Sequence, residues 1–340
     1  MSLRLIYKYM TQQEFLQDLE AFLQEWQNDE PTVWVHTSGS TGTPKPLLVE
    51  KERMRSSAHI TCSFLGLKEG DSALLCMPLQ YIAGKMVVVR SLVAGLRLLP
   101  VAPSGHPLKD LEEIPTFAAM IPMQVYNTLQ VAEEREKLMK IKHLIIGGGA
   151  IDDRLANALK VFPNHVWSTY GMTETLSHIA LRRLNGKESS DWYTPFESVN
   201  IRLSEEGTLI IHAPKVCPEE LTTNDIAEIN SEGKFRILGR KDNTINSGGV
   251  KIQIEQVETA LKAHLDIPFQ ITARKDAKFG EIVVLIYNKV KEEADIRRIC
   301  EEKLPAYWVP KVYLPVEELP LTGTGKPDRA TARKWAESGE

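Results

Sequence analysis

One loop constrains the fold more than any other stretch: the segment His36–Lys45 reads His-Thr-Ser-Gly-Ser-Thr-Gly-Thr-Pro-Lys. The preceding Pro31–Val35 favours a short strand, and Pro44 excludes a helix that begins directly after the loop. Glycines let backbone amides approach an anion, hydroxyl side chains donate hydrogen bonds to it, and a lysine adds positive charge. The loop therefore predicts a phosphate-binding site, with a flexible surface turn as the alternative. The binding residues would be Thr37, Ser38, Gly39, Ser40, Thr41, Gly42 and Lys45.

This loop differs from the P-loop of kinases and GTPases, in which Gly-x-x-x-x-Gly-Lys is followed by Ser or Thr and opens a helix. The later pair Gly325-Lys326 does not fit that pattern either, because Pro327 follows it. The sequence therefore predicts a phosphate site of another kind.

A second glycine run, Gly147–Gly149, follows the apolar segment His143–Ile146. The dinucleotide-binding fingerprint would need a third glycine at position 152, which is Asp. Two interpretations remain. Either the run is a tight turn between a strand and a helix, or it is a flat surface on which a purine lies, formed by Gly148, Gly149 and Ala150.

The composition excludes several classes of protein. Of the 340 residues, 43% are hydrophobic and 25% are charged, and the net charge is −4 with both signs interspersed, which argues against a nucleic-acid partner. The most apolar region, Ala73–Val89, is interrupted by polar residues, so a membrane span is not expected. Four scattered cysteines lack metal-ligand spacing and are expected to be reduced, mostly buried thiols of a cytoplasmic protein.

Strands that alternate with helices predict an α/β architecture with largely parallel sheets. The clearest helix is Thr11–Gln27, which begins with a capping box. Other helices are expected at about 50–65 and at 85–94, with Pro78–Gly84 as a turn, and short strands at 72–77, 96–100, 117–120, 143–146 and 165–167. From Asn200 to Leu238 the pattern changes to a small β unit.

We place a domain boundary after Gly239. Residues 1–239 would form a large domain with mixed or parallel sheets, and residues 240–340 a smaller α+β domain. The second domain is expected to contain helices at 254–264 and 292–303, a strand at 281–287 and a proline-rich tail.

Tyr170-Gly-Met-Thr-Glu174 is the second strong chemical signal. An aromatic ring can stack on adenine, a threonine hydroxyl can donate to a phosphate, and a carboxylate can hold Mg²⁺. The run Thr222-Thr-Asn-Asp225 is a weaker signal, because Asp225 could be an ordinary turn residue. Asn tolerates left-handed backbone angles, so a turn at Asn224 is expected.

These segments, together with Gly239–Lys251 and Leu319–Lys326, resemble in order and spacing the motifs of the adenylate-forming superfamily, which includes acyl-CoA synthetases, luciferases and adenylation domains. Tyr-Gly-x-Thr-Glu and Leu-Pro-x-Thr-x-x-Gly-Lys are matched in full, whereas Asn224 replaces the usual glycine of Thr-Gly-Asp. The resemblance covers Val33–Arg329. Members usually have a sizeable subdomain before the phosphate loop, so the resemblance implies a shortened member.

The resemblance implies roles for individual residues. Lys326, Thr173 and Glu174 would be catalytic, with Glu174 also on the metal. The nucleotide would be bound by the phosphate loop and by Gly148, Gly149, Ala150, Tyr170, Gly171, Asp225 and Arg240. The resemblance also implies that residues 1–239 are the ATP- and acid-binding domain and that residues 240–340 are the mobile domain that carries Lys326. Asp242 would be the pivot between the domains, and Gly248 and Gly249 would lie on the CoA side.

The implied reaction uses ATP, Mg²⁺ and CoA to convert a small carboxylic acid to an acyl-adenylate and then to a thioester. Tyr170–Thr175 and Asn243–Ile252 look most like the o-succinylbenzoate–CoA ligases of menaquinone biosynthesis. Pro78–Gly84 matches their Pro-Leu-x-His-x-x-Gly only in part, since Tyr81 replaces the histidine. A second substrate carboxylate needs a nearby cation, for which Lys85, Arg90 and His178 are candidates.

Three alternatives stay open at this point. The chain could be another acyl- or aryl-CoA ligase, an adenylation enzyme that loads a carrier protein, or a nucleotide-binding regulatory protein without turnover. The intact Lys326 loop argues against the last of these. A homo-oligomer is compatible with the sequence, which does not indicate its size.

Overall fold

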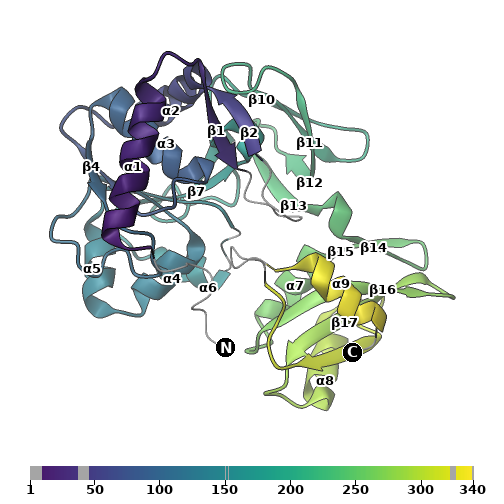
Figure 1. Cartoon of the computed structure of the whole chain (residues 1–340). Coiled ribbons are helices and arrows are strands. Elements are labelled where there is room, and N and C mark those ends of the chain that lie inside the picture. Colours follow the sequence, from purple (N-terminus) through teal and green to yellow (C-terminus); the bar gives the residue numbers. More distant parts are fainter. Residues whose placement is uncertain (1–9, 37–45, 150, 152, 322–326, 339–340) are drawn as a thin grey trace. The chain divides into compact units, whose positions relative to one another are not determined.

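The computed structural model describes residues 10–36, 46–149, 151, 153–321 and 327–338 (Figure 1). The chain divides into two compact units. The first comprises Met1–Ile201, Ile211–Leu221 and Asn230–Phe235, and the second comprises Arg202–Ile210, Thr222–Ile229 and Arg236–Glu340. The predicted boundary after Gly239 stays a prediction.

A seven-stranded sheet organises the first unit, with the strand order β4-β3-β5-β6-β7-β8-β9. The first five strands in this order are parallel, and the last two pairings are antiparallel. The strands are β3 (Ser72–Leu75), β4 (Arg97–Pro100), β5 (Phe117–Met120), β6 (His143–Ile146), β7 (His165–Gly171), β8 (His178–Arg183) and β9 (Thr194–Pro195). The predicted α/β class with a mixed, largely parallel sheet is confirmed.

Helices cover the sheet because every residue of β3, β5 and β6 is buried, which leaves both faces apolar. On one face, Val125, Leu138 and Leu155 of three short helices pack with Leu144 of β6. These helices are α4 (Pro122–Leu129), α5 (Ala132–Lys140) and α6 (Asp153–Leu159). Helices α2 (Lys51–Leu65) and α3 (Ile82–Ala94) pack against each other, and α3 contacts β3.

Helix α1 (Gln12–Gln27) begins as predicted, with Thr11 and Glu14 in a reciprocal capping box, and buries Phe15, Phe22 and Trp26. Beside it in the chain, β1 (Thr32–His36) and β2 (Pro46–Glu50) form a two-stranded antiparallel sheet. A four-stranded sheet follows later in the chain, with the strand order β10-β11-β12-β13. Its strands are β10 (Asn200–Leu203), β11 (Thr208–His212), β12 (Leu221–Ile229) and β13 (Phe235–Arg240).

A five-stranded sheet with helices on both faces forms the core of the second unit. Along β17, Val283, Leu285 and Tyr287 pack with α7 and α8, whereas Val284 and Ile286 pack with α9, as the two-residue period of a strand requires. The strands are β14 (Thr244–Ser247), β15 (Val250–Gln253), β16 (Phe269–Asp276), β17 (Gly280–Asn288) and β18 (Val312–Val316). The helices are α7 (Ile254–Lys262), α8 (Glu293–Lys303) and α9 (Arg329–Ser338). The predicted α+β character is confirmed.

Two local predictions were wrong. The segment Pro78–Gly84 is not a turn throughout, because α3 begins at Ile82. The proline-rich tail contains a strand, β18, and a helix, α9, whose buried residues are Ala332 and Ala336. Small alanine side chains give a helix only a weak hydrophobic period, which hides it in the sequence.

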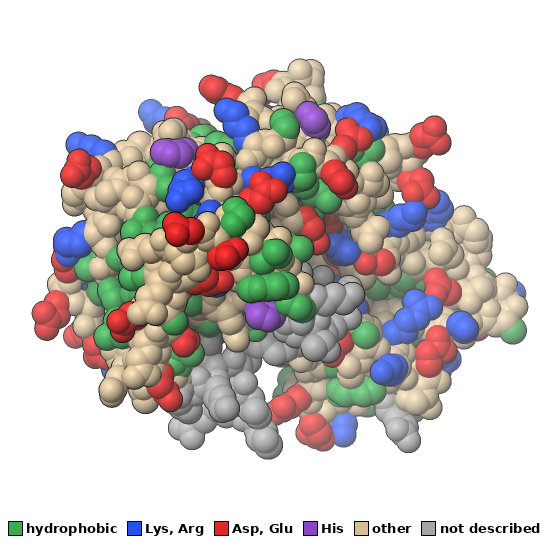
Figure 2. Space-filling view, turned by 45° about the horizontal axis from the view of Figure 1, so that its top comes forward, with side chains coloured by type: hydrophobic (Ala, Val, Ile, Leu, Met, Phe, Trp, Pro, Cys, Tyr) green, Lys and Arg blue, Asp and Glu red, His purple; other side chains and the backbone are tan. Residues whose placement is uncertain are grey.

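Charged side chains of both signs alternate over the face that Figure 2 presents. On α8, Arg297 forms an ion pair with Glu293 and Arg298 forms one with Asp295, each about one helical turn apart. Such exposed pairs contribute little to stability.

Candidate functional site

Part of the predicted nucleotide-binding set and the predicted catalytic Lys326 lie outside the residues that the structure describes. These residues are Thr37, Ser38, Gly39, Ser40, Thr41, Gly42, Lys45, Ala150 and Lys326. The strands that flank the loop are described, and His36 of β1 pairs with Pro46 of β2. The backbone N–H of His36 donates to the carbonyl of Gln80 at 3.3 Å, so this strand end lies beside the segment that precedes α3.

Tyr170 to Glu174 run from the end of β7 into a 3₁₀ turn, Thr173–Thr175. The ring of Tyr170 is half-buried and contacts the rings of Tyr193 and Phe235, with centroid distances of 5.9 and 5.0 Å. Thr173 is buried and Glu174 is exposed. The segment thus presents an aromatic ring held by other rings and a carboxylate open to solvent.

The turn after this segment is tightly constrained. A Cβ atom on Gly171 would lie 2.2 Å from the carbonyl oxygen of Ser177 and 2.4 Å from the Cα of His178, so only glycine fits there. Among the described residues, Leu176 is the one non-glycine residue with positive φ, at 64°. Buried residues in such conformations cluster at functional sites. Here the conformation turns the chain so that Ser177 and His178 enter the core.

The three candidate cations have different surroundings. Lys85 Nζ donates to Glu25 Oε2 at 2.9 Å and to the carbonyl of Trp34 at 2.7 Å, so it joins α3 to α1 and β1. His178 is buried, and burial holds its pKa well below the usual range, so it is neutral. Of these three residues, only Arg90 is charged and has no carboxylate partner among the described residues.

Arg90 lies on α3 with 2% of its surface exposed. Its Nη2 donates to Ser177 Oγ at 2.5 Å. Its Nε has no hydrogen-bond partner among the described residues. Burial lowers the pKa of the guanidinium to about 10, which still leaves it protonated at neutral pH.

Two further hydrogen bonds connect Ser177 to α2. Ser177 Oγ lies 3.1 Å from His178 Nδ1, and His178 Nε2 lies 3.1 Å from Thr61 Oγ1. Thr61 Oγ1 in turn donates to the carbonyl of Ser57 at 3.1 Å. We did not predict Ser177 or Thr61 from the sequence. Ser177 belongs to no motif in the sequence, and only the fold brings Thr61 to His178.

The glycines after β6 are required by the backbone. Gly148 has a φ of 77°, and a Cβ on Gly147 would lie 2.4 Å from Thr169 Oγ1. The turn interpretation therefore explains both residues, and contact with a purine stays a prediction for Gly148 and Gly149.

The structure brings together three predicted residues of the second unit: Asp225, Arg240 and Asp242. Arg240 Nη1 donates to Asp225 Oδ1 at 3.1 Å, and its Nε and Nη2 donate to the two carboxylate oxygens of Asp242 at 2.9 and 2.8 Å. The hydrogen bonds to Asp242, followed by the charge of Asp225, raise the pKa of Arg240. The expected turn at Asn224 is wrong, because this residue lies inside the continuous strand β12.

Gly248 and Gly249 form the two-residue turn between β14 and β15, with φ angles of 58° and 83°. Positive φ at both positions is what a type I′ hairpin turn requires. A Cβ on Gly249 would meet nothing within 4 Å. The hairpin alone accounts for both glycines, and their place on the CoA side stays a prediction.

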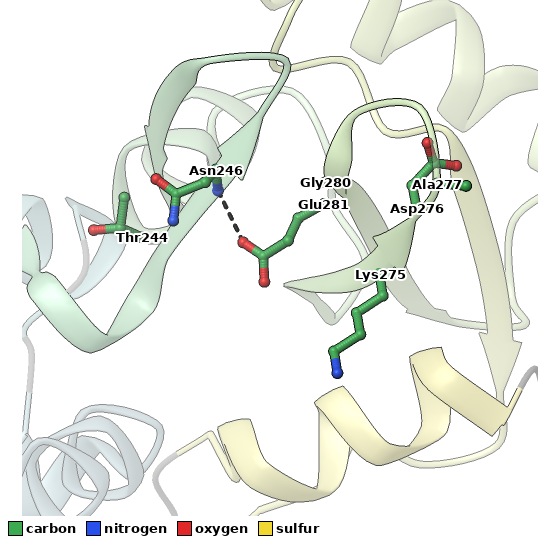
Figure 3. Close-up of a pocket in the computed structure, with 7 residues that line it drawn as sticks. All are labelled: Thr244, Asn246, Lys275, Asp276, Ala277, Gly280 and Glu281. Carbon is green, nitrogen blue, oxygen red and sulfur yellow. Dashed lines mark hydrogen bonds between the residues drawn. The ribbon is translucent and has the colours of Figure 1, made fainter.

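A separate open pocket of about 610 Å³ lies in the second unit (Figure 3). Its wall joins β14 to the turn between β16 and β17, and the backbone N–H of Asn246 donates to Glu281 Oε2 at 2.9 Å. The pocket contains none of the predicted site residues; it is lined by Thr244, Asn246, Lys275, Asp276, Ala277, Gly280 and Glu281. We assign it no catalytic role.

Within the described ranges, no group of three or more His, Cys, Asp and Glu side chains could hold a metal ion. A magnesium ion would thus depend on substrate phosphates plus a carboxylate such as exposed Glu174, which is how Mg²⁺ usually binds. In the part of the chain that the structure covers, no helix is both long and apolar enough to span a membrane. All four cysteines are free and buried, as predicted.

Comparison with known proteins decides the family. Residues 7–211 match the family described as AMP-binding enzyme. The chain belongs to this family. The resemblance inferred from the motifs is therefore confirmed.

Relatives extend over nearly the whole chain. The "2-succinylbenzoate–CoA ligase" of Listeria monocytogenes serotype 4b is 27% identical over 94% of this chain and 73% of its own length. The crystal structure of an "acyl-CoA synthetase (AMP-forming)/AMP-acid ligase II-like protein" from Dyadobacter fermentans is 31% identical, covers 95% of both chains and has a TM-score of 0.66. The o-succinylbenzoate CoA synthetase of Bacillus subtilis has been solved with its acyl-adenylate intermediate. It is 22% identical to this chain and covers 88% of this chain and 68% of its own. Its TM-score of 0.74 shows that the two proteins share a fold.

Proposed function

We propose that the protein is an ATP-dependent, AMP-forming acid–CoA ligase. In the first step a carboxylate oxygen attacks the α-phosphorus of ATP, and the bond to pyrophosphate breaks. In the second step the thiol of CoA attacks the acyl carbon, AMP leaves and the thiol proton is lost. Membership of the AMP-binding enzyme family and the names of the relatives support this reaction.

The residues of this chain would act mainly by positioning and charge. The ring of Tyr170 offers a rigid face for adenine, and Thr173 donates to phosphate. Glu174, exposed at the 3₁₀ turn, would hold Mg²⁺, which neutralises phosphate charge when bound. Lys45 and Lys326 would stabilise the negative charge that develops on the phosphate. Asp225 and Arg240, already hydrogen-bonded to each other, would bind the ribose.

The acid that the structure favours carries a second carboxylate, and the buried charge of Arg90 is the observation that carries this assignment. A buried, unpaired cation costs free energy unless a partner compensates it. An acid with an additional carboxylate would supply that partner, whereas acetate or a fatty acid would leave the charge unpaired. We therefore propose o-succinylbenzoate as the substrate, in line with the names of the relatives.

The same proposal places the protein in the cytoplasm, where ATP and CoA are available and where its four free cysteines would stay reduced. Its oligomeric state stays a prediction.

The test is AMP release in the presence of ATP, Mg²⁺ and CoA over a panel of acids. We expect o-succinylbenzoate to react far faster than acetate or palmitate. Arg90→Met should raise the KM for o-succinylbenzoate about 100-fold, as expected when a buried charge pair loses one member, and should leave the KM for ATP unchanged. Equal rates with acetate or palmitate would favour another acyl-CoA ligase, and no pyrophosphate release with any acid would favour a regulatory nucleotide-binding protein.

A further inference from the structure

The hydrogen bonds between Arg90 and α2 have a fixed direction. Thr61 donates its only hydroxyl proton to the carbonyl of Ser57, so its oxygen must accept a hydrogen bond from His178 Nε2–H. A neutral imidazole carries one proton, so His178 Nδ1 must accept from the hydroxyl of Ser177. The oxygen of Ser177 is then left to accept from Arg90 Nη2. Each group therefore has one role as donor or acceptor, and this series of hydrogen bonds ends on the guanidinium of Arg90.

The positions of these residues leave them little freedom to rearrange. Thr61 and Arg90 are 0% and 2% exposed, and His178 is 7% exposed. Ser177 is held by its backbone, because its N–H donates to the carbonyl of Thr175 at 2.7 Å and its carbonyl accepts from Thr175 Oγ1 at 2.8 Å. Ser177 therefore presents its oxygen to Arg90 from a rigid turn.

A protonated His178 would break this order. Both ring nitrogens would then be donors, and the hydroxyl of Ser177 would have to turn its proton elsewhere. Burial and the charge of Arg90 both disfavour the imidazolium, in that order of importance. The arginine and the histidine thus support each other's state: the charge of Arg90 adds to burial in keeping His178 neutral, and a neutral His178 lets Ser177 accept from Arg90.

We propose that Thr61, His178 and Ser177 form a positioning relay that orients the guanidinium of Arg90 toward the second carboxylate of the acid, so that substrate selectivity depends on hydrogen bonds that begin on α2. This inference rests on the proposed function and deepens it. Arg90 binds the substrate; His178 and Thr61 act only through it. A carboxylate is recognised best by two parallel N–H donors, which demands a fixed guanidinium plane. One nitrogen held by Ser177 sets that plane.

The relay predicts that a remote hydroxyl controls selectivity. We compare o-succinylbenzoate with 3-benzoylpropionate, which lacks only the carboxylate on the ring. Ser177→Ala should lower the ratio of the two kcat/KM values about 10-fold, through the KM for o-succinylbenzoate, because the hydrogen bond to the charged Arg90 is lost. Thr61→Val should lower the ratio in the same way, because His178 Nε2–H loses its acceptor and no longer fixes the direction of the Ser177 hydroxyl. His178→Asn, which can still accept from Ser177, should retain more selectivity than His178→Leu.

Ser91→Ala is the matched control. Ser91 is a buried serine on α3 that donates to the carbonyl of Val87 at 2.9 Å, the same kind of bond as Thr61 to Ser57, and it takes no part in the relay. It should leave the ratio unchanged. Equal losses with both acids in Thr61→Val and Ser177→Ala would overturn the relay in favour of a purely structural role.

Binding of the two acids, measured by calorimetry in the wild type and in Thr61→Val, separates this inference from the proposed function. It needs no turnover. An absence of AMP release by the wild type would contradict the ligase activity alone. Discrimination between the two acids that is present in the wild type and lost in Thr61→Val would support the relay, and the same discrimination in both proteins, or in neither, would overturn it.

Discussion

The backbone of Gly171 passes so close to Ser177 and His178 that a single added carbon has no space. The atoms that this carbon would meet are the carbonyl oxygen of Ser177, at 2.2 Å, and the Cα of His178, at 2.4 Å. Both are backbone atoms, which cannot move aside as the end of a flexible side chain can. The glycine of Tyr-Gly-Met-Thr-Glu therefore keeps the predicted nucleotide-binding segment against the residues that hold Arg90.

Gly171→Ala is expected to destabilise the fold by about 1–3 kcal/mol and to reduce acid selectivity together with ATP use, because the strained turn must open. Denaturant unfolding and the KM values for ATP and acid would measure this. Gly149→Ala is the control for stability, since its Cβ would meet Pro122 at an ordinary 3.5 Å. Equal unfolding midpoints for the two variants would contradict the close approach at Gly171.

At the scale of elements, Arg240 joins three pieces of the second unit. It stands at the end of β13, pairs with Asp225 of β12, and binds Asp242 in the 3₁₀ turn Lys241–Asn243 with two parallel hydrogen bonds. The residue proposed to bind ribose is thus connected to the residue proposed as pivot. A nucleotide that draws Arg240 away from Asp242 would loosen that turn.

The proposed two-step reaction, with Asp242 as the pivot between its steps, predicts a crossed pattern in the two half-reactions. If Lys326 acts only while the adenylate forms, Lys326→Ala should slow acyl-adenylate formation by about 10²-fold or more and spare thioester formation from supplied adenylate and CoA. Asp242→Pro fixes φ at the proposed pivot and should show the reverse.

Asp242→Asn separates the two effects at this position, because it weakens the pair with Arg240 and leaves φ unrestricted. It should retain more thioester formation than Asp242→Pro. Both steps would be measured with single-turnover assays. Equal loss of both steps in Lys326→Ala would mean that this lysine is structural or that the second domain does not move.

At the scale of the whole molecule, the strands that the sequence predicted best are those whose burial is complete. Strands β5 and β6 have the predicted bounds because each is a short apolar run in a sheet covered on both faces. Strand β2 was missed because it begins with a proline and exposes Leu48, and α9 was missed because its buried face is mainly alanine. The motifs were visible because each lies in one stretch of chain. The contacts of Arg90 were not, since Thr61, Arg90 and Ser177 meet only after folding.

The parallel sheet also contains two stacked histidines at the beginning of neighbouring strands. His143 of β6 and His165 of β7 have ring centroids 5.2 Å apart, with an angle of 22° between the rings. His143 is 7% exposed, and neither of its ring nitrogens has a hydrogen-bond partner among the described residues. Burial, followed by the charges of His165 and Lys142, lowers the pKa of His143 from its usual 6.5 to about 4.

The low pKa of His143 predicts that the protein loses stability in mild acid. In the unfolded chain this histidine takes up a proton near pH 6.5, whereas in the folded chain it does so only near pH 4. Between these values the unfolded state binds more protons, so the free energy of unfolding falls as the pH falls, by about 3 kcal/mol at most from this group. Urea unfolding at intervals from pH 7.5 to 4 would measure how steeply the free energy of unfolding depends on pH.

His143→Phe is the control, because it keeps a ring against His165 and cannot be protonated. Its slope should be shallower, with His178 still contributing in the same direction. Identical slopes in the wild type and in His143→Phe would show that the stacked pair is not the acid-sensitive element of the sheet.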